Sequence, residues 1–411
     1  MRILKTRPKS LIVIFIVLAL CTCIDPYIPD LRGHDTFLVV EGLITDEISS
    51  YEIKLSRTIK AVNSIPEKVT DAVVTITDDI GHKTILKNFG NGLYKTDSTV
   101  FTGTVGKTYT LQISTGDGNE YKSEPGTMLP VPEIDSIYYA RDEEFGNNQS
   151  EIFQGIRIYL DSKTGDETDK YYRWAYEETW KFKLPNPKRY NFVNDSTILP
   201  VDTVKEFCWR ENKSTEILTS SMEQVQTGFI KKEPMAFLSP EISDRLSEQY
   251  SILVKQYSIS KKEYEFWNNL KKVNETGGDI FGSQPFPVIS NVSNINNFNE
   301  RVLGYFQVSA VKHKRKYITF MELVKLYLPL FHYDCVRIES CPDDYACFKC
   351  TPLTFWDVYN MWDAKPYYSF VEPLYDPETK KLTKLVFTTR SCSDCELTGT
   401  LKKPDFWVDI N

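Results

Sequence analysis

Apolar and polar residues alternate with a period of two along the first part of the chain. From Phe37 onward, short runs rich in β-branched and aromatic residues, such as FLVVEGLIT, YEIKLSRTI and KTYTLQIST, are separated by turn sequences such as NFGNG and TGDGNEY. No helical spacing lies between these runs. The pattern therefore predicts an antiparallel β-sandwich over residues 37–128, immunoglobulin-like or transthyretin-like. Pro125, Pro130 and Pro132 then stiffen the chain and mark a domain boundary.

A larger β-rich domain is predicted over residues 133–411, so the fold class is mainly β with a few helices. Its first runs, such as GIRIYLDS, read as strands, but helical spacing follows between about 195 and 299, in SPEISDRLSEQY and SKKEYEFWNNLKKVNETGG. In the second of these segments, Ser260 and Glu263 form a capping box. One face of this helix would carry Tyr264, Trp267, Leu270 and Val273. We expect the helix to pack on a sheet, and a helix that binds a partner is the alternative.

The first 22 residues have the composition of an export leader. A basic segment precedes the ten-residue apolar run LIVIFIVLAL, whereas a membrane-spanning helix needs about twenty such residues. Leu20 and Thr22 occupy the positions that a lipoprotein signal peptidase reads before Cys23, whereas Cys21 would follow the bulky Leu20 directly. We therefore expect cleavage after residue 22, a lipid-modified Cys23 that holds the protein on a membrane, and a polar tether over 23–36. An uncleaved anchor helix is the disfavoured alternative.

One predicted strand is dense in aromatic side chains. Its alternating positions place four large rings on one face, namely Tyr172, Trp174, Tyr176 and Trp180. Flat rings stack on sugars or peptides at low entropic cost, which makes this face a candidate ligand surface. The favoured interpretation is a domain core, because large aromatic residues usually supply buried area.

Six cysteines crowd into a span of 61 residues near the C-terminus, in part as two C-x-x-C pairs. They are Cys335, Cys341, Cys347, Cys350, Cys392 and Cys395. Thiolates at such spacing bind zinc in reducing compartments, but an exported chain meets oxidising conditions, so disulfides are favoured. A zinc site and a redox-active pair are the alternatives. Six cysteines allow fifteen connectivities, and Cys208 is a seventh thiol that is left over or pairs outside the chain.

Composition and motifs argue against two classes of function. The chain contains no G-x-S-x-G, phosphate-binding glycine loop or H-E-x-x-H motif, and its four histidines are not spaced to share a metal ion. We therefore expect no catalytic residues, no metal, no cofactor and no enzymatic activity. Removal of the leader, which carries four basic and no acidic residues, takes the formal net charge from −7 to −11. So acidic a chain does not attract nucleic acid.

Several segments together resemble a known family. FLVVEGLITDE, GTVGKTYTLQIST, YKSEPGTMLPVPEIDSIYY, NVSNINNFNERVLGYFQVSA and CSDCELTGTLKKPDFW are similar, in order and wording, to outer-membrane lipoproteins of Bacteroidota described as domain of unknown function 4249. The similarity covers the chain from about Cys23 to Trp407. It implies a lipoprotein of the outer membrane, surface-exposed or periplasm-facing, that assists a TonB-dependent receptor, and it implies no catalytic residue.

The leading hypothesis is therefore a non-enzymatic, lipid-anchored accessory protein that partners a TonB-dependent receptor in ligand capture or uptake. Attachment to the membrane confines the protein, so weak contacts with a receptor suffice through effective concentration. The alternative is a structural or assembly component of an envelope complex with no ligand of its own.

Overall fold

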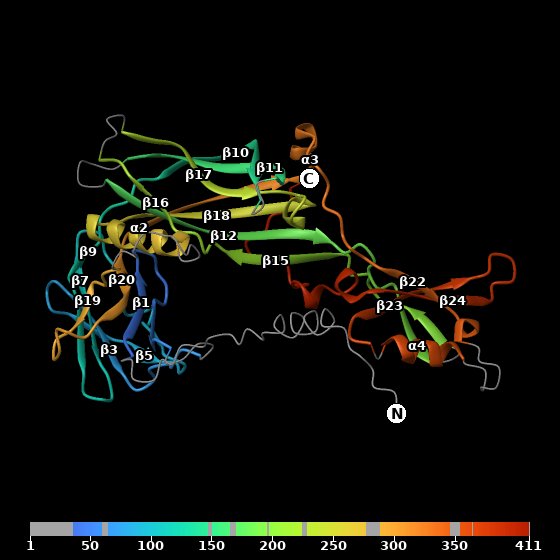
Figure 1. The fold of residues 1–411 in the computed structure, drawn as a ribbon, viewed down its shortest axis with the longest axis horizontal. Coiled ribbons are helices and arrows are strands. Elements are labelled where there is room, and N and C mark those ends of the chain that lie inside the picture. The colour runs from blue at the N-terminus through green and yellow to red at the C-terminus, as the bar shows by residue number, and fades with distance from the viewer. Residues whose placement is uncertain are drawn as a thin grey trace, which may run out of the picture.

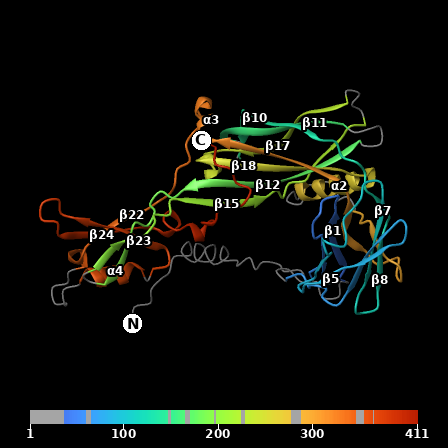
Figure 2. The same ribbon diagram turned by 180° about the vertical axis from the view of Figure 1, so that it is seen from behind.

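The computed structural model describes residues 36–59, 65–146, 150–164, 170–194, 197–223, 228–276, 288–345, 354–363 and 365–410. Figure 1 shows an elongated arrangement of three units, with a β-sandwich at one end, two long sheets in the middle and a small unit at the other end. The same order is seen from behind in Figure 2. The mainly β fold with few helices is confirmed. Among the described residues, no helix has both the length and the apolar character needed to cross a membrane.

The sandwich consists of two sheets that share one hydrophobic core. One sheet has the order β20-β1-β2-β6-β5, and the other has the order β19-β8-β7-β3-β4 with β9 beside β7. The strands of the N-terminal segment are β1 (Leu38–Ile44), β2 (Glu52–Arg57), β3 (Val73–Asp78), β4 (Lys83–Ile85), β5 (Lys87–Asn88), β6 (Leu93–Lys95), β7 (Thr108–Ser114), β8 (Glu120–Ser123) and β9 (Gly126–Thr127). Alternate residues point inward, so Val40 and Ile53 of one sheet and Ile76 and Leu111 of the other are fully buried.

Two strands from much later in the sequence complete this sandwich. β19 (Val292–Asn294) pairs antiparallel with β8, and β20 (Val302–Val308) pairs parallel with β1. Figure 1 shows the orange β19 and β20 among the blue strands. The predicted sandwich over 37–128 is therefore incomplete. Gly304 has φ +84°, and a Cβ there would lie 2.0 Å from the Val40 carbonyl oxygen, so the β20–β1 contact requires glycine.

The middle unit stacks a three-stranded sheet, β10-β11-β17, on a larger one, β15-β12-β18-β21, in which β16 also pairs with β12. Their bounds are β10 (Ile134–Phe145), β11 (Ile152–Lys163), β12 (Tyr171–Lys183), β15 (Phe207–Lys213), β16 (Leu218–Ser221), β17 (Phe229–Leu238), β18 (Gln249–Ser258) and β21 (Val311–Thr319). The sheets enclose one core, in which Ile156 and Ile158 of β11 join Trp174 of β12 and Ile252 of β18.

In its described part, the region expected to be helical, 195–299, contains more strand than helix. SPEISDRLSEQY forms only the 3₁₀ turn η1 (Asp244–Leu246) before β18 begins. The second helical segment is confirmed as α2 (Lys261–Thr276). The Ser260 hydroxyl accepts the Glu263 N–H at 3.2 Å, which is the expected cap. α2 packs on the larger sheet of the middle unit, where Tyr264 and Trp267 lie against a small cluster that contains Tyr171 and Tyr257.

The C-terminal unit contains a three-stranded sheet, β22-β24-β23, and the hairpin β13-β14, which the chain contributes much earlier. The bounds are β13 (Tyr190–Asn194), β14 (Thr197–Pro200), β22 (Arg337–Ser340), α4 (Phe355–Asp363), β23 (Tyr368–Tyr375) and β24 (Leu382–Thr389). Phe192 of the hairpin packs with Tyr359 of α4 and Phe370 of β23 in a small aromatic core. The remaining short elements are α3 (Phe320–Leu323), η2 (Val324–Leu326), η3 (Pro342–Tyr345), η4 (Arg390–Cys392) and η5 (Cys395–Leu397).

Candidate functional site

The aromatic face of β12 is core. Tyr172, Trp174, Tyr176 and Trp180 are all buried, with at most 7% of any side chain exposed. Trp174 Nε1 donates to Gln256 Oε1 at 2.9 Å, and Trp180 Nε1 donates to an Asp244 carboxylate oxygen at 3.0 Å. These bonds satisfy the indole N–H groups inside the core. The favoured interpretation is confirmed, and the ligand surface is ruled out because its rings are inaccessible.

Two disulfides tie the C-terminal cysteines to distant parts of the chain. Cys395 bonds to Cys208, 187 residues away, and Cys392 bonds to Cys335. Cys208, which the sequence left without a partner, is therefore part of the disulfide framework. The two cysteines of the C-terminal C-x-x-C motif bond in different directions, so they do not form a redox-active pair with each other. Cys341 lies half-buried just after β22.

Three of the predicted site residues, Cys23, Cys347 and Cys350, lie outside the residues that the structure describes. Within the described residues, no group of three or more His, Cys, Asp or Glu side chains could hold a metal ion.

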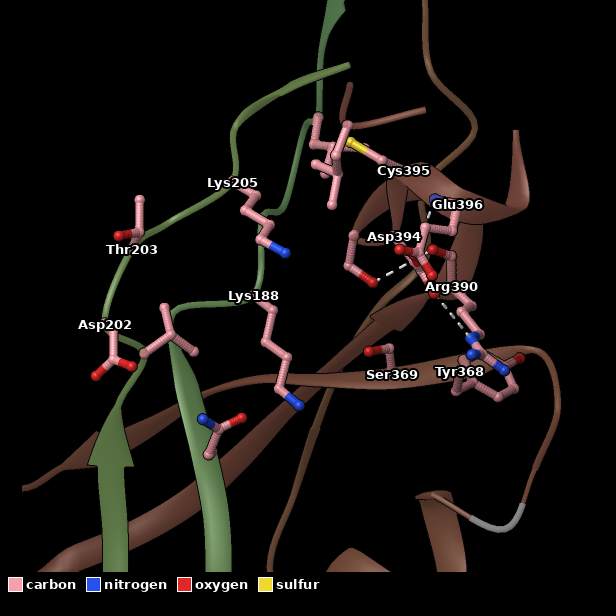
Figure 3. A pocket seen from close by; sticks show the side chains of 15 residues that line it. Lys188, Asp202, Thr203, Lys205, Tyr368, Ser369, Arg390, Asp394, Cys395 and Glu396 are labelled. Atoms are coloured by element: carbon pink, nitrogen blue, oxygen red, sulfur yellow. Dashed lines mark hydrogen bonds and ion pairs between the residues drawn. The ribbon is translucent and has the colours of Figure 1, made fainter. Parts of the chain in front are cut away.

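The disulfides frame a polar pocket with a volume of about 730 Å³ between the middle and C-terminal units. Figure 3 shows its walls. They come from the segment between β12 and β13, the loop after β14, the start of β23 and the turns η4 and η5. These segments are held together by backbone contacts as well, since the Asn186 N–H donates to the Cys392 carbonyl at 3.0 Å, and Trp209 and Thr400 exchange two backbone hydrogen bonds. The pocket is therefore built on a cross-linked frame.

Charged side chains of both signs line the two facing walls of this pocket. In Figure 3, the Lys188 and Lys205 side chains extend from one wall toward Arg390, Asp394 and Glu396 on the other. Arg390 Nε lies 3.4 Å from an Asp394 carboxylate oxygen. Within the described part of the chain, neither lysine ammonium has a hydrogen-bond or ion-pair partner. The pocket can therefore offer two free cations to a polar ligand.

No pattern in the sequence predicts that these residues line a pocket. Lys188 and Lys205 stand in loops without a motif, and only the C-x-x-C motif, which contains Asp394, marked any part of the site.

Comparisons with known proteins give one informative result. A family model described as "Domain of unknown function (DUF4249)" matches residues 24–315. No curated protein matches the chain. One solved structure with some similarity is the BSP domain of a biofilm associated protein, at 7% identity and a TM-score of 0.11, over 68% of this chain and 58% of that one. So low a score carries no argument about the fold or the function.

Proposed function

The chain belongs to the DUF4249 family, a domain of unknown function, and we propose that it is a lipid-anchored, non-enzymatic accessory protein of the outer membrane. In this role it captures a ligand and partners a TonB-dependent receptor in its uptake. The observation that carries the proposal is a polar pocket on a disulfide-bonded frame, in a chain whose first 22 residues have the composition of an export leader.

Anchoring is supported by the sequence and by the cysteine chemistry. Leu20 and Thr22 are residues of the kind that a lipoprotein signal peptidase accepts before its cysteine, which supports cleavage before Cys23. The bonds Cys208–Cys395 and Cys335–Cys392 fit a protein that folds in an oxidising compartment, because disulfides persist there and are rare in the cytosol.

Ligand capture is supported by the form of the pocket. A site that is already shaped before binding loses little conformational freedom when the ligand enters. The Cys208–Cys395 bond joins β15 to the wall that carries Asp394, and Lys188 and Lys205 face this wall from the other side. This arrangement suits a small polar ligand with a negative group for the lysines.

The first test is a pull-down from detergent-solubilised outer membranes with the tagged full-length protein. We expect a TonB-dependent receptor to co-purify, together with a small polar molecule that mass spectrometry identifies. Cys23→Ala should remove the protein from the membrane fraction and lose the receptor. Recovery of the wild-type protein outside the membrane, or without any receptor, would contradict the proposal.

The second test separates capture from assembly. The double variant Lys188→Glu/Lys205→Glu should lose the small molecule and keep the receptor, because only the pocket charge is reversed. Lys83→Glu/Lys122→Glu is the matched control, since both lysines are exposed on the distant sandwich. If the receptor co-purifies and no small molecule accompanies any variant, the protein is a structural component of an envelope complex instead.

A further inference from the structure

A second cavity, of about 640 Å³, lies where the sandwich meets the middle unit. Its floor is the outer face of the sandwich sheet, because Val39 and Leu43 of β1 alternate with the inward-pointing Val40 and Ile44. Leu303 pairs with Val39 in the parallel β20–β1 ladder and extends this face. α2 supplies the facing wall through Phe266, Trp267 and Leu270. Figure 1 shows α2 between the sandwich and the long strands of the middle unit. We call this cavity the junction groove.

Two polar side chains stand at the inner end of this apolar groove. Arg173 of β12 donates through Nη1 to Gln307 Oε1 of β20 at 3.0 Å, and its guanidinium lies 4.3 Å from the centre of the Trp267 ring. Gln307 is 2% exposed, and its Nε2 finds no hydrogen-bond partner within the described residues. A buried amide N–H without an acceptor is unfavourable, because it has lost its hydrogen bonds to water and gained none in return. This donor is closed off as the side chain stands, so a ligand in the groove satisfies it when the Gln307 amide turns toward the groove.

The positive charge of Arg173 is not paired with a carboxylate. No Asp or Glu oxygen of the described chain lies within 4.0 Å of its guanidinium, which instead lies over the faces of Trp267 and Tyr257. Burial lowers the pKa of Arg173, yet arginine stays protonated in proteins. Glu263 is the acid whose charge, when it is ionised, favours the charged form of Arg173. Burial raises the pKa of Glu263 to about 8, so this carboxyl group is mostly neutral at pH 7.

The other charges that line the groove lie on its β1–β2 side. Glu41 and Lys54 face each other across the two strands, and Glu52 pairs with Lys95 at 2.7 Å. Arg173 is thus the charge at the inner end, beside the free donor of Gln307. An apolar channel that ends in a cation and an amide N–H complements a molecule with an apolar body and one terminal anion.

We propose that the junction groove binds a small carboxylic acid with an apolar body, whose carboxylate accepts hydrogen bonds from Arg173 and Gln307 Nε2. The apolar body lies between α2 and the outer face of β1 and β20, against Trp267 and Leu303. This site is separate from the disulfide-framed pocket and does not depend on a receptor.

The test uses the full mature chain with Cys23→Ser, so that no acyl chain of its own competes. Titration calorimetry compares decanoate, decan-1-ol and decylamine, which share one apolar body and differ in the end group. Decanoate should bind at least tenfold more tightly than decan-1-ol, because a hydrogen bond to a charged group is stronger than one to a hydroxyl. Decylamine should bind most weakly, since its ammonium meets Arg173.

Variants locate the site. Arg173→Gln should weaken decanoate binding about tenfold or more and leave decan-1-ol unchanged, whereas Arg141→Gln, on an exposed part of the middle unit, should change neither. Leu270→Glu covers the case in which Arg173→Gln does not fold. It places a carboxylate on the half-exposed wall of α2 and should also abolish decanoate binding.

Equal affinity for decanoate and decan-1-ol, no decanoate binding at millimolar concentration, or full binding by the Leu270→Glu variant would overturn the proposal. A dimer that forms through this groove and excludes decanoate would overturn it as well, and would identify a second copy of the chain as the occupant. None of these outcomes affects the receptor partnership, which the pull-down tests separately.

Discussion

Glu263 offers the sharpest test of how α2 is packed, because the fold buries its carboxyl group almost completely. Only 3% of the residue is exposed, and burial raises its pKa from 4.5 to about 8. The hydrogen bond from Trp267 Nε1, at 3.2 Å, and the charge of Arg173 both act in the opposite direction, but burial outweighs them. The perturbation is Glu263→Gln, which keeps the shape of the protonated acid and its acceptor oxygen.

The size of the effect follows from the difference between the two pKa values. In the unfolded chain Glu263 ionises near pH 4.5, and in the folded protein it keeps its proton up to about pH 8. Between these values the folded state holds more protons, so the free energy of unfolding falls as the pH rises. Each pKa unit corresponds to about 1.36 kcal/mol, so the full loss is on the order of 5 kcal/mol and is complete above pH 8.

The assay is urea unfolding followed by tryptophan fluorescence at several pH values from 4.5 to 9. Wild type should lose stability across this range more steeply than Glu263→Gln, and the variant should be the more stable protein above pH 8. Glu265→Gln is the matched control, because it removes an exposed carboxylate two residues away on the same helix and should follow wild type. Parallel pH curves for wild type and Glu263→Gln, or a less stable Glu263→Gln protein at pH 9, would refute the reasoning.

Three further predictions concern the disulfides, the anchor and the sandwich. Cys208→Ser and Cys395→Ser should each lower the free energy of unfolding by about 2–4 kcal/mol. The double variant should be as stable as either single variant, because all three lack the same disulfide. Additive losses in urea unfolding would contradict this prediction. Metabolic acyl labelling should disappear in Cys23→Ala and persist in Cys21→Ala, and the reverse would move the cleavage site. A fragment of residues 33–127 should show no cooperative melting, since it lacks β19 and β20; a sharp calorimetric transition would show that these strands are dispensable.

Local sequence patterns correctly predict those helices and strands whose conformation is decided by residues close to one another in the chain. The period-two runs from Phe37 become strands because alternate side chains enter a core, and α2 forms where Ser260 caps a helix with an aromatic face. The segment SPEISDRLSEQY misleads because helical spacing and a short turn before a strand look alike over a few residues. Its Asp244 is buried and receives hydrogen bonds from Trp180 and Arg210, so tertiary contacts decide its conformation.

Pairing between distant segments leaves no such local trace. β20 joins β1 across about 260 residues, and only Gly304, with its positive φ and close contact to Val40, hints that a strand passes closely there. The Cys208–Cys395 disulfide is also a contact between distant segments. The number of cysteines limits the possible pairings but does not determine which of them forms. The junction groove and the polar pocket are both built from such distant pairings, which is why the sequence revealed neither.

The proton on Glu263 and the anion proposed for the junction groove are linked through Arg173. While Glu263 is neutral, the charge of Arg173 is free to attract a carboxylate, and once Glu263 ionises it competes for that charge. Tyr305 of β20 also faces Glu263, but its pKa is raised, so the phenol stays neutral. Decanoate affinity should therefore fall roughly tenfold between pH 6.5 and pH 9, as expected for two like charges near one cation in a partly buried site. Glu263→Gln should bind decanoate equally at both pH values, and a pH dependence that survives this substitution would show that another group controls the groove.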